Sequence, residues 1–475
     1  MSLTTVNVSS SAAGTITTGA ALTVNNSGTA STLAGRVDGT GGLVKAGGGT
    51  LILNSAANSY TGGTTVSAGT LKVGVAGAVP NRTVTVHGTF DLDGISEDIG
   101  NLAGSGTVTN TGATAATLSV GLNNSDGNFS GVIQDGASVL ALTKKGSGTQ
   151  RLTGSSPNTF TGVTTVNIGT LLLGKSSGNA IGGNLAIGEG AASSGNSWVQ
   201  LGASQQIPDT SIVTFAPPST FHFSYLKLMG LNETVGGIWD TSGRGVIENT
   251  QNESGYGNGT LTIQNSAPSS FNGFLRNTGS GSGLLAVVKL GSGTLTYSGE
   301  NISYSGGTTI GGGVLALGTG SNYFRSVVTY GRMAFSAGST GTFRIGDNEV
   351  TIGGLTTDPV TPGTPVVENG SSNPHTLYVR TGVSDTFAGV LRDGGTGALA
   401  LWKGGEGTLT LSGGAANTLT GDTTVLNGTL ALSKSSGHAI GGNLNIGRSE
   451  DAVHKFVQLE ASDQIPDTSV VTFAS

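Results

Sequence analysis

The stretch "KAGGGTLILNSAANSYTGGTTVSAGTL", Lys45 to Leu71, packs glycine and threonine around a few aliphatic residues and contains nothing suited to acid-base chemistry. Its opening phrase returns as "KKGSGTQRL" from Lys144, "KLGSGTLTY" from Lys289 and "KGGEGTLTL" from Lys403. Each copy is followed by a second bend and strand: "YTGGTTVSAGTLKVG" from Tyr60, "FTGVTTVNIGTLLLG" from Phe160, "YSGGTTIGGGVLALG" from Tyr304 and "LTGDTTVLNGTLALS" from Leu419. Self-similarity of this kind predicts a repeat architecture rather than a local turn.

A second unit is longer and closer to identity. "GKSSGNAIGGNLAIG" from Gly174 recurs as "SKSSGHAIGGNLNIG" from Ser433, and "VQLGASQQIPDTSIVTF" from Val199 recurs as "VQLEASDQIPDTSVVTF" from Val457. The separation between the two copies hardly changes along the unit, so the chain contains a duplicated superrepeat. We predict one continuous domain over 1–475, with modules at about 31–110, 129–250, 271–357 and 387–475, the last of them truncated.

The alternation of residues within the repeats predicts strands. In "GTLTL", Leu409 and Leu411 fall on one face while Thr408 and Thr410 fall on the other. Strands of this length, bounded by Gly, Asn and Asp, cannot bury a face alone, so neighbouring coils must stack on them. We expect an all-β fold, a right-handed parallel β-helix (β-solenoid) built from degenerate Gly/Thr-rich repeats. An array of β-sandwich domains of roughly 100 residues each is the alternative, but the unequal intervals between the four lysine phrases favour the solenoid.

Composition excludes several classes of protein. Of 475 residues, 84 are Gly, 10% are charged and none is Cys, and the net charge is −6. Glycine does not fall on every third position, which excludes collagen, and no Lys/Arg cluster indicates nucleic-acid binding. The absence of Cys excludes disulfides and thiolate metal sites. No apolar run is long enough for a transmembrane helix.

The combined pattern "K-x-G-x-G-T-L-x-L-x-G" and "N-x-Y-T-G-G-T-T-V-x-x-G-T-L" resembles the autotransporter-associated β-strand repeat, also called the passenger-associated transport repeat. The copy from Lys45 matches it most fully, whereas Val163 and Asp422 replace the second Gly of the turn and Leu419 replaces the aromatic residue. The resemblance implies a right-handed β-helical passenger domain of a large secreted bacterial protein, often an adhesin, and it brings no catalytic residues. We therefore expect a non-catalytic structural or adhesive rod, extracellular or at the cell surface, with host or surface glycans or proteins as partners.

The two ends of the chain add an expectation about its context. It opens without a basic and apolar leader and ends at "SVVTFAS", where the earlier copy continues "SIVTFAPPSTF". We expect an internal segment or one subunit of a longer stack, with its signal and anchor outside these residues. Two alternatives stay open: a filament subunit that self-associates end to end, and a carbohydrate-active β-helix enzyme.

Candidate reactive residues are few. Asp91, Asp93, Glu97 and Asp98 crowd into "FDLDGISED", and paired carboxylates can cleave glycosides. However, Glu97 has apparent counterparts that stand before "GG" at Glu233 and Glu349, which predicts that it serves a turn. The five histidines show no metal-ligand spacing; they are His87, His222, His375, His438 and His454. Asp is also too sparse for the calcium-binding nonapeptide repeat. We predict no catalytic, cofactor-binding or metal-binding residue.

One segment, from Ser219 to Trp239, departs from the repeats. Phe221, Phe223 and Tyr225 alternate onto one face, and Trp239 follows. Two interpretations remain open. The aromatic side chains either plug the core or cover a coil, or they form an exposed platform that contacts sugars or proteins.

Overall fold

The computed structural model describes residues 2–4, 9–10, 14–28, 30–189, 195–217, 221–250, 257–278, 283–299, 301–318, 331–347, 349–447 and 454–473. Within these ranges all regular structure is β-strand and no helix occurs. The chain divides into two compact units, Met1–Lys227 and Leu228–Ser475. The continuous domain over 1–475 therefore stays a prediction.

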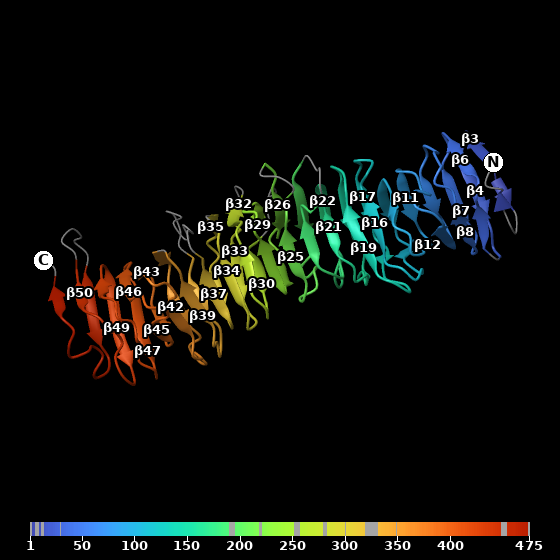
Figure 1. The fold of residues 1–475 in the computed structure, drawn as a ribbon. Helices are drawn as coiled ribbons and strands as arrows, with labels where there is room; N and C mark the ends of the chain where they lie inside the picture. Colours follow the sequence, from blue (N-terminus) through green and yellow to red (C-terminus); the bar gives the residue numbers. More distant parts are fainter. Residues whose placement is uncertain are drawn as a thin grey trace. The chain divides into compact units, whose positions relative to one another are not determined.

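In the first unit, short strands stack side by side in successive layers (Figure 1, blue to green). One run of paired strands is β1 (Ser2–Thr4), β4 (Leu22–Asn25), β7 (Leu43–Ala46), β9 (Thr64–Val66), β11 (Thr83–Val86), β14 (Asn101–Gly104), β17 (Gly127–Phe129), β20 (Thr149–Leu152), β22 (Gly169–Leu173), β24 (Ser197–Leu201) and β26 (Ser224–Lys227). A second is β2 (Ser9–Ser10), β5 (Ser31–Leu33), β8 (Thr50–Leu53), β10 (Thr70–Val73), β12 (Thr89–Asp91), β15 (Thr107–Thr109) and β18 (Val132–Ile133). The others are β13 (Glu97–Asp98), β16 (Ala116–Val120), β19 (Leu140–Lys144), β21 (Thr164–Val166), β23 (Leu185–Ile187) and β25 (Ile212–Phe215), and the pair β3 (Thr15–Thr18) and β6 (Arg36–Gly39).

The second unit repeats this plan. Its longest run is β28 (Gly237–Asp240), β31 (Ser269–Phe271), β34 (Thr294–Tyr297), β37 (Val314–Leu317), β39 (Thr342–Ile345), β42 (Val366–Asn369) and β45 (Val390–Asp393). Beside it stand β27 (Asn232–Val235), β30 (Gly259–Ile263), β33 (Leu285–Lys289), β36 (Thr308–Ile310), β38 (Met333–Phe335) and β41 (Leu355–Thr357), and the run β29 (Gly245–Thr250), β32 (Phe274–Thr278) and β35 (Asn301–Ser303). The last two runs are β40 (Val350–Ile352), β43 (His375–Arg380), β46 (Leu399–Gly404), β48 (Thr423–Val425), β50 (Leu444–Ile446) and β52 (Val471–Phe473), and β44 (Asp385–Phe387), β47 (Thr408–Gly413), β49 (Gly428–Lys434) and β51 (Lys455–Leu459).

The strands pair in parallel, and each coil is in register with its neighbour. Leu51 of β8 pairs with Leu71 of β10, and Leu430 of β49 pairs with Val457 of β51. A hydrogen bond from the Asn58 side chain to the Ala78 carbonyl joins two successive coils across 20 positions of the chain. Parallel strands that are next to one another in space and separated by one full turn of chain define a β-solenoid. The fold class predicted from the repeats is confirmed.

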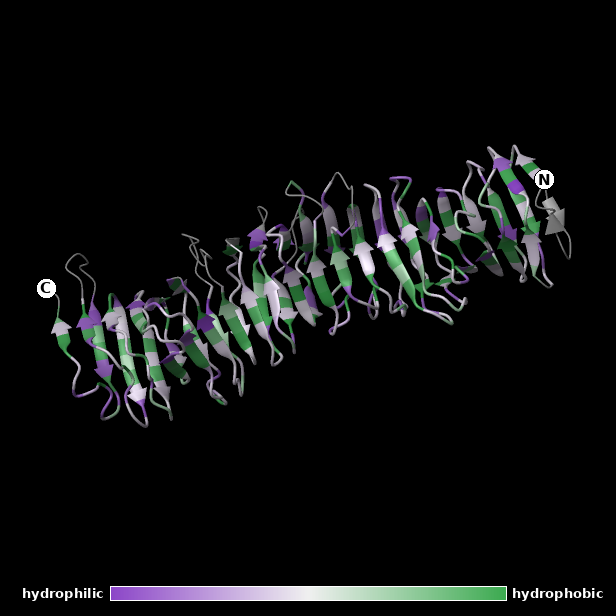
Figure 2. Ribbon diagram, in the orientation of Figure 1, coloured by the Kyte–Doolittle hydropathy of each residue, from purple (hydrophilic) through white to green (hydrophobic). Residues whose placement is uncertain are grey.

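The core follows from the alternation of each strand. Leu51 and Leu53 of β8 are fully buried, as are Leu409 and Leu411 of β47, while the residues between them are only half-buried. Figure 2 shows this as hydrophobic and more polar bands that follow one another along single strands. Because each inward residue lies over its register partner, the aliphatic side chains form continuous columns within each unit. Side chains that face outward are therefore the ones available for recognition.

Candidate functional site

The lysine that opens each repeat points into the coil. Lys45 follows the inward Leu43 by two positions on β7, and none of its surface is exposed. Its Nζ donates to the backbone carbonyls of Ala46 at 2.8 Å, Gly47 at 2.7 Å and Ala68 at 3.1 Å. We call this arrangement the lysine clamp. The other copies bond in the same way: Lys144 to Lys145, Gly146 and Ile168; Lys289 to Leu290, Gly291 and Gly312; Lys403 to Gly404, Gly405 and Asn427.

The clamp ties one coil to the next through a buried cation. Two carbonyls belong to the turn that follows the lysine, and the third lies 23 positions further along the chain at Ala68. Hydrogen bonds from an ammonium are stronger than those between neutral groups. Burial nevertheless lowers the pKa of the lysines, to about 8 for Lys144, Lys289 and Lys403, because desolvation disfavours the charged form. The ammonium therefore persists at neutral pH. The inward position of Lys45 could be read from the sequence, because Lys45 follows the inward Leu43 by two residues.

A glycine closes each clamp. Gly69 has a φ of +66°, and a Cβ at this position would lie 2.4 Å from the carbonyl oxygen of Gly47 and 2.7 Å from the Lys45 Nζ. Both the left-handed backbone and the close approach exclude a larger residue. The equivalent residues also have positive φ; they are Gly169, Gly313 and Gly428. Each of these glycines is therefore fixed by its positive φ and by the turn carbonyls of the preceding coil, and the lysine Nζ also comes close at Gly69 and Gly313.

An asparagine provides a second tie between coils. Asn58 accepts a hydrogen bond from the Val37 amide at 2.8 Å and donates to the Ala78 carbonyl at 2.8 Å, so that it bridges the coils before and after its own. Asn158 and Asn417 make the same pair of bonds in their repeats. In the third repeat Ile302 stands at this position. Because the amide satisfies two buried backbone groups, its loss would leave both unpaired.

The crowded carboxylates of the first unit bind backbone and lysine groups. Glu97 accepts hydrogen bonds from the amides of Gly77 at 2.8 Å and Val79 at 2.7 Å, and burial raises its pKa to about 7. Asp91 accepts from the Thr111 amide at 2.9 Å. Asp98 is paired with Lys145 at 3.1 Å. Glu97 thus serves a turn, as the sequence predicted.

The predicted equivalence of three glutamates is wrong at one position. Glu97 and Glu233 are buried, whereas Glu349 is exposed just before β40. Glu97 precedes Gly100 by three residues, but Glu349 precedes Gly353 by four. A shift of one residue turns a side chain to the other face of a strand. The three phrases look alike in sequence because each has a glutamate shortly before a glycine, and this likeness hides the extra residue at Glu349.

The histidines lie on separate coils. His438 places Nδ1 2.7 Å from the carbonyl oxygen of Asp463, and His375 places Nε2 3.7 Å from an Asp347 oxygen. Within the described residues no group of three or more His, Cys, Asp or Glu side chains lies together in a way that would hold a metal ion.

Several aromatic side chains gather on the outside of the first unit. Trp198 of β24 and Tyr225 of β26 are register partners whose ring centroids lie 6.0 Å apart, with 23° between the planes. Phe223 lies 6.1 Å from Tyr225, and the Lys227 Nζ lies 5.6 Å from the Tyr225 centroid. We call Trp198, Phe223, Tyr225 and Lys227 the aromatic face. All four are half-buried.

Tyr225 does not plug the core, whereas the interpretation in which the aromatic side chains cover a coil stays open. Ser224 and Leu226 are the buried residues of β26, so Tyr225 faces outward between them. Phe221 is 86% exposed, while residues 218–220 lie outside the described ranges. Trp239 belongs to β28 of the second unit and is 37% exposed. Sequence reasoning missed Trp198, although its place between the inward Ser197 and Val199 was a signal.

The four lysine clamps coincide with a known repeat. Residues 43–73, 142–173, 287–317 and 401–432 match the family described as Passenger-associated-transport-repeat. The chain carries four passenger-associated transport repeats. Every matched segment contains one clamp lysine and the glycine that closes it. The predicted resemblance is therefore confirmed. In this structure each transport repeat contains the hydrogen bonds that connect one coil to the next.

A stretch of 157 residues is also 39% identical to a protein named adhesin BmaC autotransporter from Brucella suis biovar 1 (strain 1330). The match covers 32% of this chain and only 4% of the relative's length. No solved structure matches the chain. Among the described residues there is no helix with the length and apolarity needed to cross a membrane.

The transport repeats differ from one another in one buried pair. The Tyr60 hydroxyl lies 2.7 Å from the Thr64 hydroxyl, and Tyr304 lies 2.6 Å from Thr308. Where the aromatic residue is Phe160, or is replaced by Leu419, the equivalent hydroxyls of Thr164 and Thr423 are buried without a hydrogen-bond partner among the described residues. A buried hydroxyl without a partner costs stability. In these two repeats the buried threonine hydroxyl therefore lacks the hydrogen bond that it makes in the other two.

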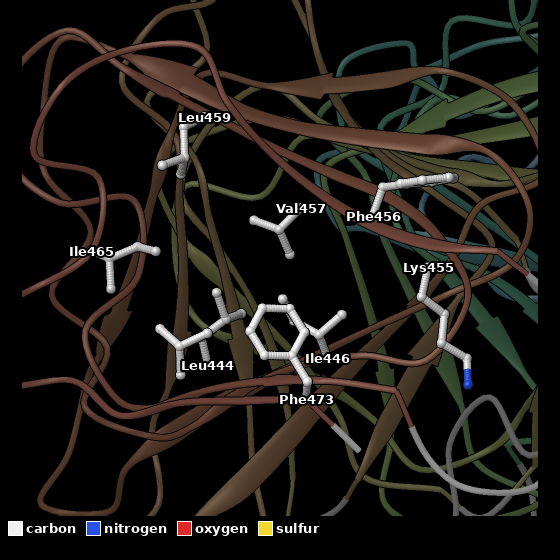
Figure 3. Close-up of a pocket in the computed structure, with 9 residues that line it drawn as sticks. Leu444, Ile446, Lys455, Phe456, Val457, Leu459, Ile465 and Phe473 are labelled. Atoms are coloured by element: carbon white, nitrogen blue, oxygen red, sulfur yellow. The ribbon is translucent and has the colours of Figure 1, made fainter. Parts of the chain in front are cut away.

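The last described coil of the second unit exposes apolar side chains. Leu459 is 60% and Phe473 is 76% exposed. Figure 3 shows Phe473, Val457 and Ile446 converging on a hollow, with the Lys455 ammonium directed away from it. The hollow is lined by Leu444, Ile446, Lys455, Phe456, Val457, Leu459, Ile465, Val471 and Phe473. Apart from Lys455 its lining carries no ionisable group, which makes it unsuited to acid-base chemistry.

Proposed function

We propose that this chain is part of the passenger of a secreted bacterial autotransporter, and that it serves at the cell surface or outside the cell as a non-catalytic structural and adhesive segment. One observation carries the proposal: in all four transport repeats the recurring lysine is bonded to backbone carbonyls of two coils. The recurring chemistry of the repeat thus holds the fold together, and recognition is left to outward residues.

The comparison with an adhesin supports the adhesive part of this proposal. The relative is named an adhesin and an autotransporter, and it shares 39% identity over the matched stretch. The carboxylates that sequence reasoning weighed for glycoside cleavage are engaged by amides or lysines, as at Glu97 and Asp98. Both observations favour a surface that binds over one that reacts.

Surface display tests the proposal. The chain is fused between a cleavable signal peptide and an autotransporter barrel in a non-adherent bacterium, and protease accessibility on intact cells is scored together with adhesion to coated surfaces. We expect accessible protein and adhesion above the level of the barrel alone. Protein that never reaches the surface would contradict the passenger role, and displayed protein without adhesion would contradict the adhesive role.

The two alternatives from the sequence stay predictions with tests of their own. Release of reducing ends from a panel of polysaccharides would contradict the non-catalytic proposal. Fibres that lengthen over a hundredfold range of concentration in electron micrographs would favour end-to-end self-association.

A further inference from the structure

We propose that the last described coil of the second unit binds an extended polypeptide segment as an added strand. The segment has aliphatic side chains at alternate positions, which enter the hollow of Figure 3, and a basic side chain between them, which meets Glu460 on the rim. The class of partner is therefore a basic, amphipathic β-strand. This site is independent of the proposed adhesive function.

The hollow is apolar and open. Its volume is about 360 Å³, and three of the side chains around it are unusually exposed for their type: Phe473 is 76%, Leu459 is 60% and Val471 is 42% exposed. Apolar side chains that are exposed together, rather than singly, are typical of interaction surfaces. A partner that covers them gains free energy by removing their apolar area from water.

The strands around the hollow have open edges. Among the described strands β51 pairs with β49 alone and β52 pairs with β50 alone, so the far edge of each faces no other described strand. A strand edge presents a row of amide and carbonyl groups with which another extended chain forms a ladder. A compact apolar molecule would fill the hollow without bonding to these edges. The combination of hollow and edge therefore favours a polypeptide strand.

The first superrepeat copy shows what covers an equivalent strand. There β24, the counterpart of β51 in sequence, pairs in parallel with β26. Val199 lies opposite Leu226, and both are fully buried. The next pair is Gln200 and Lys227. In the second copy Val457 stands at the position of Val199 and a glutamine follows it again. A strand added in the same register therefore places an aliphatic side chain over Val457 and a polar one beside the glutamine.

The rim of the hollow carries charge that the first copy lacks. The phrase "VQLGASQQ" of the first copy becomes "VQLEASDQ" in the second, which introduces Glu460 and Asp463, both exposed. The Glu460 carboxylate accepts a hydrogen bond from the Gln458 side chain at 3.2 Å. Lys455 is at the other end of β51, and its ammonium points away from the hollow (Figure 3). Because opposite charges across an interface select the partner, a basic residue opposite Gln458 is favoured.

A peptide with the sequence of residues 221–229, FHFSYLKLM, is the probe, because it contains β26. It is labelled with fluorescein, and its binding to the full chain is measured by fluorescence anisotropy. We expect saturable binding, and a loss of affinity of about tenfold or more for a scrambled peptide and for the chain variant Leu459→Asp. Val360→Asp is the matched control, because Val360 is 84% exposed on the loop after β41. It should bind like the native chain. Thermal melting checks that both variants fold.

Two further measurements test the strand geometry and the charge. Hydrogen exchange of the β51 amides should slow when the peptide is bound, because an added strand occupies their open edge. A peptide that carries Lys227→Gln should bind several-fold more weakly than the native peptide. This preference should disappear in the chain variant Glu460→Gln/Asp463→Asn.

The proposal is overturned if native and scrambled peptides bind equally, if Leu459→Asp leaves the affinity unchanged, or if bound peptide leaves the exchange of β51 unchanged. A preference for the lysine peptide that survives in Glu460→Gln/Asp463→Asn would also contradict it. Chains that associate end to end through Leu459 and bind no peptide would identify a second copy as the occupant and would overturn the assignment of a separate basic strand. None of these results bears on adhesion by displayed cells.

Discussion

The two copies of the superrepeat, residues 169–215 and 428–473, make equivalent lysine and glutamine bonds but differ in how their outer strand is covered. Lys175 donates to the Gly131 carbonyl at 2.5 Å, 44 positions earlier, and Lys434 donates to Gly389 at 2.5 Å, 45 positions earlier. Gln206 accepts from the Lys175 amide at 2.7 Å. Gln464 accepts from the Lys434 amide at the same distance.

The burial of equivalent residues is different. Leu201 of β24 is 2% exposed, whereas Leu459 of β51 is 60% exposed. In the first unit β24 pairs with β22 and with β26, while β51 pairs with β49 as its one partner among the described strands. A coil therefore specifies its own bonds to the coils before it, but the burial of its inward side chains depends on the coil that follows.

Truncating the equivalent leucines gives the largest expected contrast. Leu201→Ala should lower the free energy of unfolding by about 2–5 kcal/mol, since it leaves a cavity in a packed column. Leu459→Ala should change it by less than about 0.5 kcal/mol. Denaturant unfolding of both variants measures the difference, and equal losses would contradict the account of how coils bury one another.

Replacing the equivalent lysines should, in contrast, give equal effects. Lys175→Met and Lys434→Met each remove a bond to an earlier coil and leave a buried carbonyl without its donor, at a cost of about 1–3 kcal/mol. Lys145→Met, at a half-buried lysine that is paired with Asp98 on the outer face, is the control. A cost in one copy much larger than in the other would show that these lysine bonds are not independent of the outer strand.

Restoring the missing hydroxyl should stabilise the second and fourth transport repeats by a smaller amount. Phe160→Tyr and Leu419→Tyr give the buried Thr164 and Thr423 hydroxyls a partner, as Tyr60 does for Thr64. We expect a gain of about 0.5–1.5 kcal/mol each, and a similar loss in Tyr60→Phe. Melting temperatures rank the variants, and a lower melting temperature for Phe160→Tyr would contradict the hydroxyl pairing.

The pH dependence is the smallest expected effect. Burial lowers the pKa of Lys175 and Lys434 to about 8, so above this pH the unfolded chain holds more protons than the folded chain. The contribution of each lysine to the free energy of unfolding therefore rises with pH between about pH 8 and the pKa of lysine in the unfolded chain. Below about pH 8 this contribution does not change with pH. Between pH 7.5 and 8.5 the gain per lysine stays below about 1.4 kcal/mol. The difference between native chain and Lys175→Met or Lys434→Met should show this slope, and a slope of opposite sign would contradict it.

The sequence predicted the repeats, the parallel solenoid and the inward leucines, because a strand period of two residues is a local property. It also contained the inward position of Lys45, two residues after Leu43, but hydrophobic periodicity alone does not suggest that a lysine lies inside. The three carbonyls around its Nζ come from two coils, so the clamp appears only when the coils are stacked.

Other features depended on register between distant residues. Glu349 looks like Glu97 in its phrase, yet one extra residue turns it outward. Trp198 and Tyr225 are far apart in sequence and become neighbours only because β24 and β26 pair. The length of each coil varies, so sequence spacing did not give this register.

The reactivity of the lysines tests the central claim most directly. Brief acetylation of the folded chain, followed by mass spectrometry, compares neighbouring residues such as Lys144 and Lys145 in one peptide. The account predicts that Lys145 is modified while the buried lysines stay protected until the chain unfolds; they are Lys45, Lys144, Lys175, Lys289, Lys403 and Lys434. If Lys144 and its equivalents react as fast as Lys145 in the folded chain, the lysine clamps do not exist and the structural role assigned to the transport repeats is wrong.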